Sequence, residues 1–437
     1  MVRTLEVALF GERVGELLQT DSGRLEFRYD AAWVERSGAA LSLSLPVRAE
    51  PFDHRGAEPF FGGLLPEEGV RDRVARYLGV SARNDFALLE QIGGECAGAV
   101  TLTVPSASST PFTPGASGEE LQPLDPARLA KLLDDLPHRP LLAGGERRLS
   151  LAGAQDKVAV SLVDGQVAIP TGDQATTHIL KTPIQGFAGT VANELLCMRT
   201  ARRVGLSVAS AERRVASGRE FLLVERFDRT FDPDGTVRRV HQEDMCQALG
   251  VPTRLKYQSE GGPSLPDCFR LLTDHARRPA VDRLALVRAT AFNVLIGNAD
   301  AHAKNFSLVH APSGISLSPL YDLLSTLVYG DLSPRYAMKI GSKAEFKNIR
   351  ARHWDALSEA SGLAPAQVRR ELREMVTRLP SALRSERDQV IDEAETAGSE
   401  AGDGGLGDEA LAMLGRLIEE TVERCEITGV QLLKGAD

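Results

Sequence analysis

One stretch near residue 300 constrains the fold more than any other part of the chain. The apolar run AFNVLI, residues 291–296, leads directly into GNADAHAKN, residues 297–305, which holds an Asp, a His, a Lys and two Asn. Two strand-like runs follow, FSLVH at 306–310 and ISL at 315–317, and then Asp322 in LSPLYDLLST. The pattern predicts a long helix, a polar loop, a hairpin and a second acidic residue, in that order. A surface loop can hold such residues for solubility alone, and the rest of the sequence decides between that interpretation and an active site.

The size and charge of the chain exclude several classes of protein. Its 437 residues are enough for two or three domains with substantial cores. A net charge of −9 argues against broad, sequence-independent binding to nucleic acid, which needs a basic field. The five cysteines are scattered and form no CxxC pair, which predicts reduced thiols and neither disulfides nor a zinc site. The N-terminus lacks a signal-peptide core, and no apolar run approaches the ~20 residues that span a bilayer. We therefore expect a cytoplasmic protein with no membrane partner.

Composition divides the chain into three expected domains. Residues 1–104 fit a small α/β subdomain, with a hairpin that turns at Gly11 and Glu12 and a helix that Asn84 caps. The segment PSASSTPFTPGASGE at 105–119 predicts a linker. Residues 120–228 are rich in strand patterns, and residues 229–437 are mainly helical. The acidic, glycine-rich stretch EAETAGSEAGDGGLGDE, residues 393–409, predicts a disordered insertion in the last domain.

The spacing of polar residues after position 297 fits phosphoryl transfer from a nucleotide. Such a transfer needs a carboxylate that takes the proton of the attacking hydroxyl, and oxygen ligands that hold Mg²⁺ against the phosphates. Asp300 and Asn305 can supply the first and part of the second, and Asp322 the main metal ligand, in the order found in protein kinases. Lys304 could neutralise charge on the transferred phosphate. An Asp or Asn near a helix end is more often a cap, and His302 is more often structural, so only the complete order favours catalysis.

Lys181 and Glu194 follow the order of a kinase ion pair. In kinases, a strand lysine contacts the nucleotide phosphates and pairs with an acidic residue on the following helix. Lys181 ends the strand-like run THILK, and Glu194 opens the helix-like run NELLCMRTARRVG. A lone strand-end lysine is usually solvated and a lone first-turn glutamate usually serves the helix dipole, but the two in this order predict the pair. Further along, the backbone of LLVERFDR at Glu225, Arg226 and Phe227 could hydrogen-bond an adenine ring.

A phosphate-binding loop is expected before this strand, although no G-x-G-x-x-G-x-V motif occurs. The segment RRLSLAGAQDKVAV at 147–160 stands in its place. The small residues Ala152, Gly153 and Ala154 let backbone N–H groups approach phosphate oxygens, and Lys157 adds positive charge. Ser150, which follows two arginines closely, could itself accept a phosphate that alters the loop. A simple turn between strands is the alternative interpretation, because most Gly-Ala stretches are turns.

Taken together, these motifs resemble one known family. The segments SLAGAQDK, HILK, the NE pair of NELL, VERFDR, HQEDMCQALG, GNADAHAKN and PLYD are similar to motifs of the HipA family of serine/threonine kinases, the toxins of bacterial toxin–antitoxin pairs. LSLSLPV, FFGGLLPEEGVR and GGECAGAV resemble the N-terminal subdomain of that family. The resemblance implies an α+β, two-lobed protein-kinase-like fold with a small N-terminal α/β subdomain and a mainly helical C-terminal lobe. It also implies ATP and Mg²⁺ as cofactors and transfer of the γ-phosphate to a protein serine or threonine.

The resemblance also assigns roles position by position. It makes Asp300 the catalytic base, acting with Lys304 and Asn305, and it makes Asn305 and Asp322 the Mg²⁺ ligands. Ser150 would be the autophosphorylation site, whose phosphorylation ejects the loop and switches the kinase off. The ATP-binding residues would be Ala152, Gly153, Ala154, Gln155, Asp156, Lys157, Lys181, Glu194, Glu225, Arg226, Phe227, Tyr321 and Asp322.

The family also implies partners. These are a small HipB-like helix-turn-helix antitoxin, operator DNA bound only through the antitoxin complex, and a protein substrate. An aminoacyl-tRNA synthetase is the best-known substrate class, and its phosphorylation arrests translation and growth. Two other functions stay open: a nucleotide-binding co-repressor that acts with an antitoxin, and a small-molecule kinase. The intact set of Asp300, Asn305, Asp322 and Lys181 speaks against the co-repressor, and the loop with Ser150 favours a protein kinase over a small-molecule kinase.

Overall fold

The computed structural model of the chain describes residues 2–105, 121–138, 142–143, 147–148, 152–153, 155–170, 174–401 and 405–434. The chain packs as two compact units. Unit 1 comprises Met1–Thr182, Val224–Arg254 and Val309–Ala311, and unit 2 comprises Pro183–Leu223, Leu255–Leu308 and Pro312–Asp437. The domain boundaries expected from the sequence stay predictions, and the expected linker at 105–119 lies almost wholly outside the described residues.

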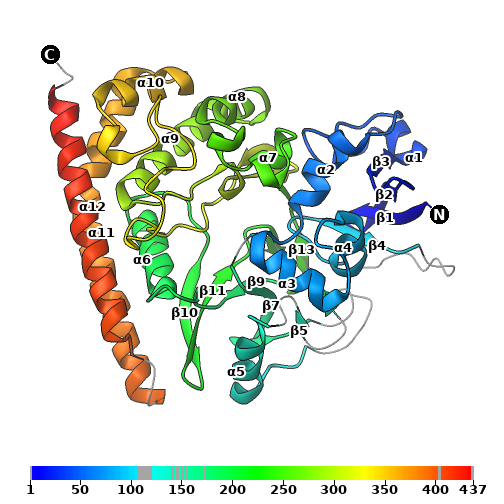
Figure 1. Ribbon diagram of the computed structural model, residues 1–437, viewed down its shortest axis with the longest axis horizontal. Helices are drawn as coiled ribbons and strands as arrows, with labels where there is room; N and C mark the ends of the chain where they lie inside the picture. The colour runs from blue at the N-terminus through cyan, green and yellow to red at the C-terminus, as the bar shows by residue number, and fades with distance from the viewer. Residues whose placement is uncertain are drawn as a thin grey trace. The chain divides into compact units, whose positions relative to one another are not determined.

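Unit 1 combines an antiparallel sheet in the order β3-β2-β1-β4 with short helices and a second group of strands (Figure 1). In this second group, β7 pairs antiparallel with both β8 and β9. The elements of this unit are β1 (Arg3–Leu9), β2 (Glu12–Gln19), β3 (Leu25–Tyr29), α1 (Ala31–Glu35), α2 (His54–Gly63), α3 (Glu68–Leu78), α4 (Asp85–Ile92), β4 (Val100–Thr103), α5 (Pro126–Asp135), β5 (Leu142–Ala143), β6 (Arg147–Arg148), β7 (Lys157–Val163), β8 (Gln166–Ala168), β9 (His178–Lys181), β12 (Arg229–Phe231), β13 (Val237–Arg239), β14 (His241–Asp244) and α7 (Met245–Ala248).

The expected N-terminal hairpin is present, but it turns one residue earlier than predicted. Its two loop residues, Phe10 and Gly11, have φ angles of 55° and 82°. A two-residue loop with positive φ at both positions matches the right-handed twist of the flanking strands, which explains why the turn selects this register. The expected helix after Asn84 is also present, and the Asn84 side chain accepts a hydrogen bond from the Ala87 amide at 3.1 Å.

Unit 2 is mainly helical and is built around the long helix α9. The apolar part of α9 is buried, and α8, α10, α11 and α12 all pack against or near it. The elements of this unit are α6 (Thr190–Arg203), β10 (Ala211–Ala216), β11 (Arg219–Glu225, whose last two residues belong to unit 1), η2 (Gln258–Glu260), α8 (Leu265–His275), α9 (Pro279–Ile296), η3 (Ala303–Asn305), β15 (Ser307–Ala311, whose last three residues belong to unit 1), β16 (Gly314–Leu317), η4 (Phe346–Asn348), α10 (Ala351–Ser361), α11 (Pro365–Ala401) and α12 (Asp408–Lys434), and a further short turn, η1 (Thr253–Leu255), spans the boundary of the units.

The expectation of a disordered segment over residues 393–409 is wrong for most of that segment. Helix α11 continues to Ala401, and α12 begins at Asp408. Alanine and glutamate, which are common in this stretch, are strong helix formers, and the helix is also anchored by packing. Glu393 accepts a hydrogen bond from Arg199 of α6 at 2.8 Å, and Ala394 is buried. The amphipathic helix α12 was not expected from the sequence.

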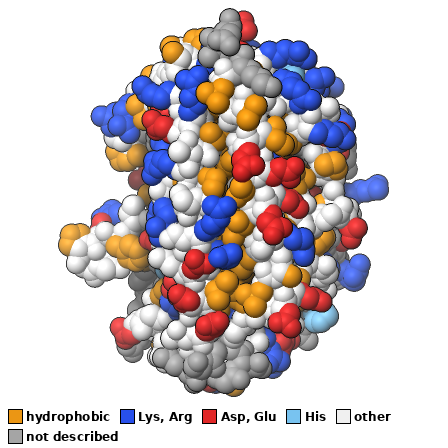
Figure 2. Space-filling view, turned by 90° about the vertical axis from the view of Figure 1, so that its left-hand side faces the viewer, with side chains coloured by type: hydrophobic (Ala, Val, Ile, Leu, Met, Phe, Trp, Pro, Cys, Tyr) orange, Lys and Arg blue, Asp and Glu red, His pale blue; other side chains and the backbone are white. Residues whose placement is uncertain are grey.

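Helices α11 and α12 expose both hydrophobic and charged side chains. The two helices lie side by side (Figure 1). Figure 2 views this side of the chain, where hydrophobic side chains lie among acidic and basic ones. The exposed aliphatic residues of α12 are Leu411, Ile427, Val430 and Leu433. No helix among the described residues has the length and apolar character needed to cross a membrane.

Two smaller expectations were tested by the local structure. The run HQEDMCQALG was expected to be helical, but its first four residues form β14 and only Met245–Ala248 form a helix. Asp244 and Gln247 make a capping box at the start of this helix, which fixes the change from strand to helix.

The five cysteines are all buried and free of disulfides, as expected.

Candidate active site

The polar loop at 297–305 starts at a glycine that terminates α9. Gly297 has a φ of 77°, and a Cβ at this position would meet the guanidinium of Arg424 at about 3 Å. Arg424, on α12, donates hydrogen bonds to the carbonyl oxygens of Leu295 at 2.7 Å and Ile296 at 3.2 Å. Carbonyl groups at a helix C-terminus lack intrahelical partners, and a buried arginine supplies them here. Helix α12 therefore fixes the point from which the loop departs.

The loop folds so that Asp300 and Asn305 contact each other. The Asn305 Nδ2 donates to the backbone oxygen of Asp300 at 3.1 Å, and the His302 amide donates to the same oxygen at 2.7 Å. The Asp300 carboxylate accepts a hydrogen bond at Oδ1 from the hydroxyl of Tyr257 at 2.8 Å. The two residues that the Asp-x-x-x-x-Asn spacing singled out thus lie together at one turn.

Asn298 joins this loop to the segment of Asp322, a role that the sequence did not reveal. Its Oδ1 accepts from the Asp300 amide at 3.1 Å, and its Nδ2 donates to Asn293 Oδ1 at 2.9 Å and to the Asp322 carbonyl oxygen at 3.4 Å. Its side chain is almost completely buried. The only sequence signal was an asparagine directly after the helix-ending glycine, which is also what a simple cap would give.

A second set of contacts holds the Asp322 segment against the loop. The Ala299 amide donates to Thr326 Oγ1 at 2.8 Å, and the Thr326 amide donates to the Gly297 carbonyl oxygen at 3.0 Å. Asp322 itself has a φ of 51°, which is uncommon for a residue other than glycine. This backbone conformation costs energy, and it persists only where surrounding contacts hold it. The segments of Asp300 and Asp322 are therefore adjacent within unit 2.

Tyr321 and Lys304 are linked through the backbone of the same loop. The Tyr321 hydroxyl donates to the carbonyl oxygen of Lys304 at 2.9 Å and lies 2.6 Å from Ser307 Oγ. The Lys304 side chain is buried. Tyr321 therefore fastens the loop, and its expected part in ATP binding, like that of Lys304 in catalysis, stays a prediction.

Asn305 and Asp322 offer donor atoms that suit Mg²⁺. The side-chain nitrogen of Asn305 donates to the Asp300 carbonyl oxygen, so Oδ1 is the atom of this side chain that could bind a metal. Mg²⁺ in nucleotide sites takes one or two protein oxygens, while phosphate oxygens and water complete its six ligands. No cluster of three or more His, Cys, Asp or Glu side chains that could hold a metal occurs among the described residues. The side-chain oxygens of Asn305 and Asp322 are the atoms of this loop and its neighbouring segment that would hold Mg²⁺.

Glu194 lies on a helix that is tied to the Asp322 segment. Its neighbour Asn193 accepts from the Ser325 amide at 2.9 Å and donates to the Ser325 carbonyl oxygen at 2.9 Å. Glu194 itself is buried. Because Glu194 belongs to unit 2 and Lys181 to unit 1, their ion pair stays a prediction.

In unit 1, the expected phosphate-side loop is fastened to the N-terminal subdomain. The Glu67 amide donates to the Gly153 carbonyl oxygen at 3.1 Å, and Asp156 forms an ion pair with Arg73 of α3. Gly153 has a φ of 113°, a conformation that favours glycine, and a Cβ there would meet the Lys157 amine. Gln155 donates to the Thr182 carbonyl oxygen at 2.7 Å. Ser150 and Ala154 lie outside the described residues.

The strand register brings two lysines together. Lys157 on β7 is directly opposite Lys181 on β9, and both side chains are buried. Opposite residues of an antiparallel pair point to the same face, where like charges repel each other. The expected part of both lysines in phosphate binding stays a prediction.

The expected adenine-binding segment shows a buried middle residue. The Arg226 amide donates to the Thr177 carbonyl oxygen at 2.9 Å, so a base would have to use the backbone groups of Glu225 and Phe227 or the Arg226 carbonyl. The Arg226 side chain points into unit 1, where its guanidinium donates to Asp228 at 2.8 Å and to the Cys96 carbonyl oxygen at 3.1 Å. The Arg226 side chain therefore stabilises the fold of unit 1.

Comparisons with known proteins show the family of the chain. Residues 149–383 match the HipA-like C-terminal domain, and residues 5–103 match the HipA N-terminal domain. The chain belongs to the HipA family. It is 50% identical to "Putative kinase Y4mE" of Sinorhizobium fredii over 378 residues, which are 86% of this chain and 90% of that protein. It is 32% identical to "Serine/threonine-protein kinase toxin HipA" of Shewanella oneidensis over 395 residues, 87% of this chain and 88% of that one.

A solved structure extends the HipA relationship to the whole fold. The Shewanella oneidensis MR-1 toxin–antitoxin structure of HipA, HipB and its operator DNA contains a chain that matches with a TM-score of 0.83 and 28% identity, covering 99% of both chains. The resemblance and the expected α+β, two-lobed kinase-like fold are confirmed. The roles expected for individual residues stay predictions.

A buried ion cluster lies beside the expected adenine-binding segment of this HipA-family chain, and no sequence pattern indicated the cluster. Glu95 and Asp228 face the guanidinium groups of Arg226, Arg229 and Arg239, and all five side chains are nearly or fully buried. Burial alone would raise the pKa of Glu95, but the three arginines, Arg239 first, lower it to about 2. Burial likewise opposes ionisation of Asp228, and Arg226 and Arg229 hold its pKa well below the usual range. All five residues belong to unit 1 and connect the N-terminal subdomain with the strand that ends at Glu225.

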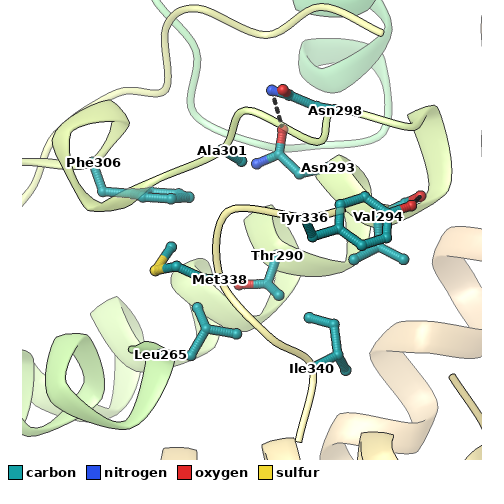
Figure 3. Close-up of a pocket in the computed structure, with 10 residues that line it drawn as sticks. All are labelled: Leu265, Thr290, Asn293, Val294, Asn298, Ala301, Phe306, Tyr336, Met338 and Ile340. Atoms are coloured by element: carbon teal, nitrogen blue, oxygen red, sulfur yellow. Dashed lines mark hydrogen bonds between the residues drawn. The ribbon is translucent and has the colours of Figure 1, made fainter. Parts of the chain in front are cut away.

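A small pocket next to the loop is too narrow for a nucleotide. Figure 3 shows the residues that line it, including Asn298 and Ala301 of the loop and Thr290 of α9. Its free interior of about 20 Å³ is roughly the room that one water molecule needs. The Thr290 hydroxyl is buried and has no hydrogen-bond partner among the described residues. The pocket therefore has room for water beside this hydroxyl.

Proposed function

We propose that this HipA-family protein is an ATP- and Mg²⁺-dependent serine/threonine protein kinase that acts as a toxin. The observation that carries the proposal is the hydrogen-bonded unit in which Asn298 joins Asp300 to the Asp322 segment, with Asn305 bound to the same turn. A kinase needs a base and oxygen ligands for a metal in this order. The names of the relatives, a kinase in Sinorhizobium fredii and a serine/threonine kinase toxin in Shewanella oneidensis, support it further.

In the proposed reaction, Asp300 takes the proton of the serine or threonine hydroxyl. The hydroxyl oxygen forms a bond to the γ-phosphorus, the bond from that phosphorus to the oxygen bridging to the β-phosphate breaks, and ADP leaves. Asn305 and Asp322 would hold Mg²⁺, which neutralises charge on the phosphate oxygens when bound.

The remaining proposed contacts to ATP come from several segments of the chain. Lys157 and Lys181 would contact the phosphates, with residues 152–156 supplying backbone N–H groups. Glu194 would orient Lys181, and Lys304 would face charge on the transferred group. Backbone groups of Glu225, Arg226 and Phe227 would bind the adenine ring.

The proposal extends to partners and regulation. We infer a HipB-like helix-turn-helix antitoxin as the partner in the cytoplasm, with operator DNA bound through the complex. The Shewanella structure, which contains HipA, HipB and operator DNA, supports this. The proposed target is a protein, with an aminoacyl-tRNA synthetase as the first candidate, and Ser150 is the proposed autophosphorylation site.

Phosphate transfer to the protein itself tests the proposed function directly. Purified protein incubated with γ-³²P-ATP and Mg²⁺ is expected to become labelled, with Ser150 as the main labelled residue in peptide mass spectrometry. Asp322→Asn should reduce the labelling by at least about 100-fold, because it removes a charged metal ligand, and EDTA should stop it in the wild type. Asp331→Asn, in an exposed position nine residues further along, is the matched control and should label normally. A wild type that binds ATP but transfers no phosphate to itself or to any protein in a lysate would favour the co-repressor.

The contact between the phosphate-side loop and the N-terminal subdomain gives a second test. Arg73→Ala is expected to raise the KM for ATP about two- to fivefold, because a partly exposed ion pair contributes roughly 0.5–1 kcal/mol and here it holds Asp156. The measurement is the ATP dependence of phosphoryl transfer. Arg76→Ala, on the same helix but in an exposed position, should leave the KM unchanged. Equal KM values for the two variants would mean that the ion pair does not shape the loop.

A further inference from the structure

We propose that Tyr257 is the positioning residue for Asp300. Its hydroxyl donates a hydrogen bond to Asp300 Oδ1 at 2.8 Å. With Oδ1 held in this way, the carboxylate plane is set and Oδ2 is the oxygen that receives the proton of the substrate hydroxyl. The inference rests on the proposed function, because it concerns how the base of that reaction is aimed.

An aspartate base needs such a partner. The terminal torsion of an aspartate is broad and roughly two-fold, so the side chain alone does not fix the plane of its carboxylate. The backbone N–H and carbonyl groups of Asp300 are tied to Asn298, His302 and Asn305, but these contacts hold only the main chain. The hydrogen bond from Tyr257, in contrast, reaches the carboxylate itself.

The backbone of Tyr257 is held in register with the loop. The Gln258 amide donates to the Ala337 carbonyl oxygen at 3.1 Å, and the Ala337 amide donates to the Ala299 carbonyl oxygen at 2.8 Å. A short series of hydrogen bonds thus leads from the residue after Tyr257 to the residue before Asp300. The Gly262 amide closes the turn on the other side by donating to the Tyr257 carbonyl oxygen at 3.0 Å.

The ring of Tyr257 is fixed as well as its backbone. It meets the ring of His302 edge to face, with centroids 5.4 Å apart and an angle of 77° between the planes. The ammonium group of Lys256 lies 5.2 Å from the centroid of the Tyr257 ring. Both contacts favour one ring orientation, so the hydroxyl is aimed before any substrate arrives. This also gives the buried His302 a structural part in the loop.

Tyr257→Phe removes the hydroxyl and keeps the ring contacts. We expect kcat for phosphoryl transfer to fall about 10- to 100-fold, since small misplacements of a catalytic group have effects of this size, while the KM for ATP stays within about twofold. Tyr336→Phe is the matched control, because the hydroxyl of this buried tyrosine of the same unit donates to the Val294 carbonyl oxygen of α9 at 2.8 Å. It should leave kcat within about twofold, and circular dichroism should show both variants folded.

A double-mutant cycle separates positioning from a general structural role. In an Asp300→Asn background, Tyr257→Phe should cause little further loss, because the tyrosine acts through the base that has been removed. The same 10- to 100-fold loss in both backgrounds would overturn the inference, as would a rise in the KM for ATP with unchanged kcat. Full activity of Tyr257→Phe beside an active wild type would also overturn it while leaving the proposed function intact. A wild type without any phosphoryl transfer would remove the proposed function, and the inference with it.

Discussion

Asp300→Asn is expected to lower phosphoryl transfer by about 10²- to 10⁴-fold, the range that a positioned general base contributes. Asparagine has nearly the same shape as aspartate and can still accept the Tyr257 hydrogen bond through its amide oxygen. It cannot take the proton of the attacking hydroxyl. The loss should therefore appear in kcat, with ATP binding retained.

The measurement combines transfer of label from γ-³²P-ATP with a binding titration of a fluorescent ATP analogue. Asp274→Asn makes the same chemical change at an exposed position on α8, and it should leave both readings unchanged. Activity of Asp300→Asn within tenfold of the wild type would remove Asp300 from its proposed role. A loss of ATP binding equal to the loss of activity would instead assign Asp300 to the nucleotide site.

The local order of the proposed site could be predicted from the sequence because short-range patterns determine it. An apolar run that ends in glycine gives a helix with a left-handed C-terminal residue, and Gly297 has this conformation. Asp300 and Asn305 are close in the chain, so their contact follows from one turn of the loop. The strands β7, β8 and β9 followed from their short runs of β-branched and other apolar residues.

The parts that could not be predicted depend on contacts between distant residues. Arg424, which caps α9, is separated from Leu295 by 129 positions, and nothing local to an arginine on an amphipathic helix indicates such a partner. Tyr257 lies 43 positions before Asp300 in a segment without a recognisable motif. The helical end of α11 was missed for a related reason, because its composition suggested a solvated segment while contacts such as that of Glu393 with α6 stabilise a helix.

The buried ion cluster is the clearest case of a feature hidden in the sequence. The segment VERFDR reads as a charged strand end, and charged residues are usually exposed. In the structure, Arg226, Asp228 and Arg229 point inward together with Glu95 and Arg239. Three guanidinium groups therefore face two carboxylates in the buried interior of unit 1. Such a cluster is stable only while its charges and hydrogen bonds are complete.

Glu95→Ala is accordingly expected to destabilise unit 1 by about 3–5 kcal/mol, the cost of leaving buried charges without their partner. The Glu95 Oε1 accepts hydrogen bonds from the Thr176 amide at 2.9 Å, from the Thr176 hydroxyl at 2.6 Å and from Arg229 at 3.2 Å. Loss of Glu95 leaves Asp228 paired with Arg226 and Arg229 and removes the carboxylate that faces Arg239. The chain contains two tryptophans, and in a Trp354→Phe background the fluorescence of Trp33, which lies in unit 1, follows urea unfolding.

The dependence of the unfolding free energy on acid pH gives a second test of the part that Glu95 plays in stability. Because the pKa of Glu95 is lowered from 4.5 to about 2 in the folded protein, its ionised form stabilises the fold above pH 4.5, and this contribution is lost as the pH falls from 4.5 toward 2. Glu95→Ala should therefore flatten the decline of unfolding free energy in this range.

Glu90→Ala, at a partly exposed glutamate on α4 that pairs with Arg3, should change stability by less than about 1 kcal/mol. If the two alanine variants lost equal stability, the cluster would be no more than a set of weak surface-like pairs.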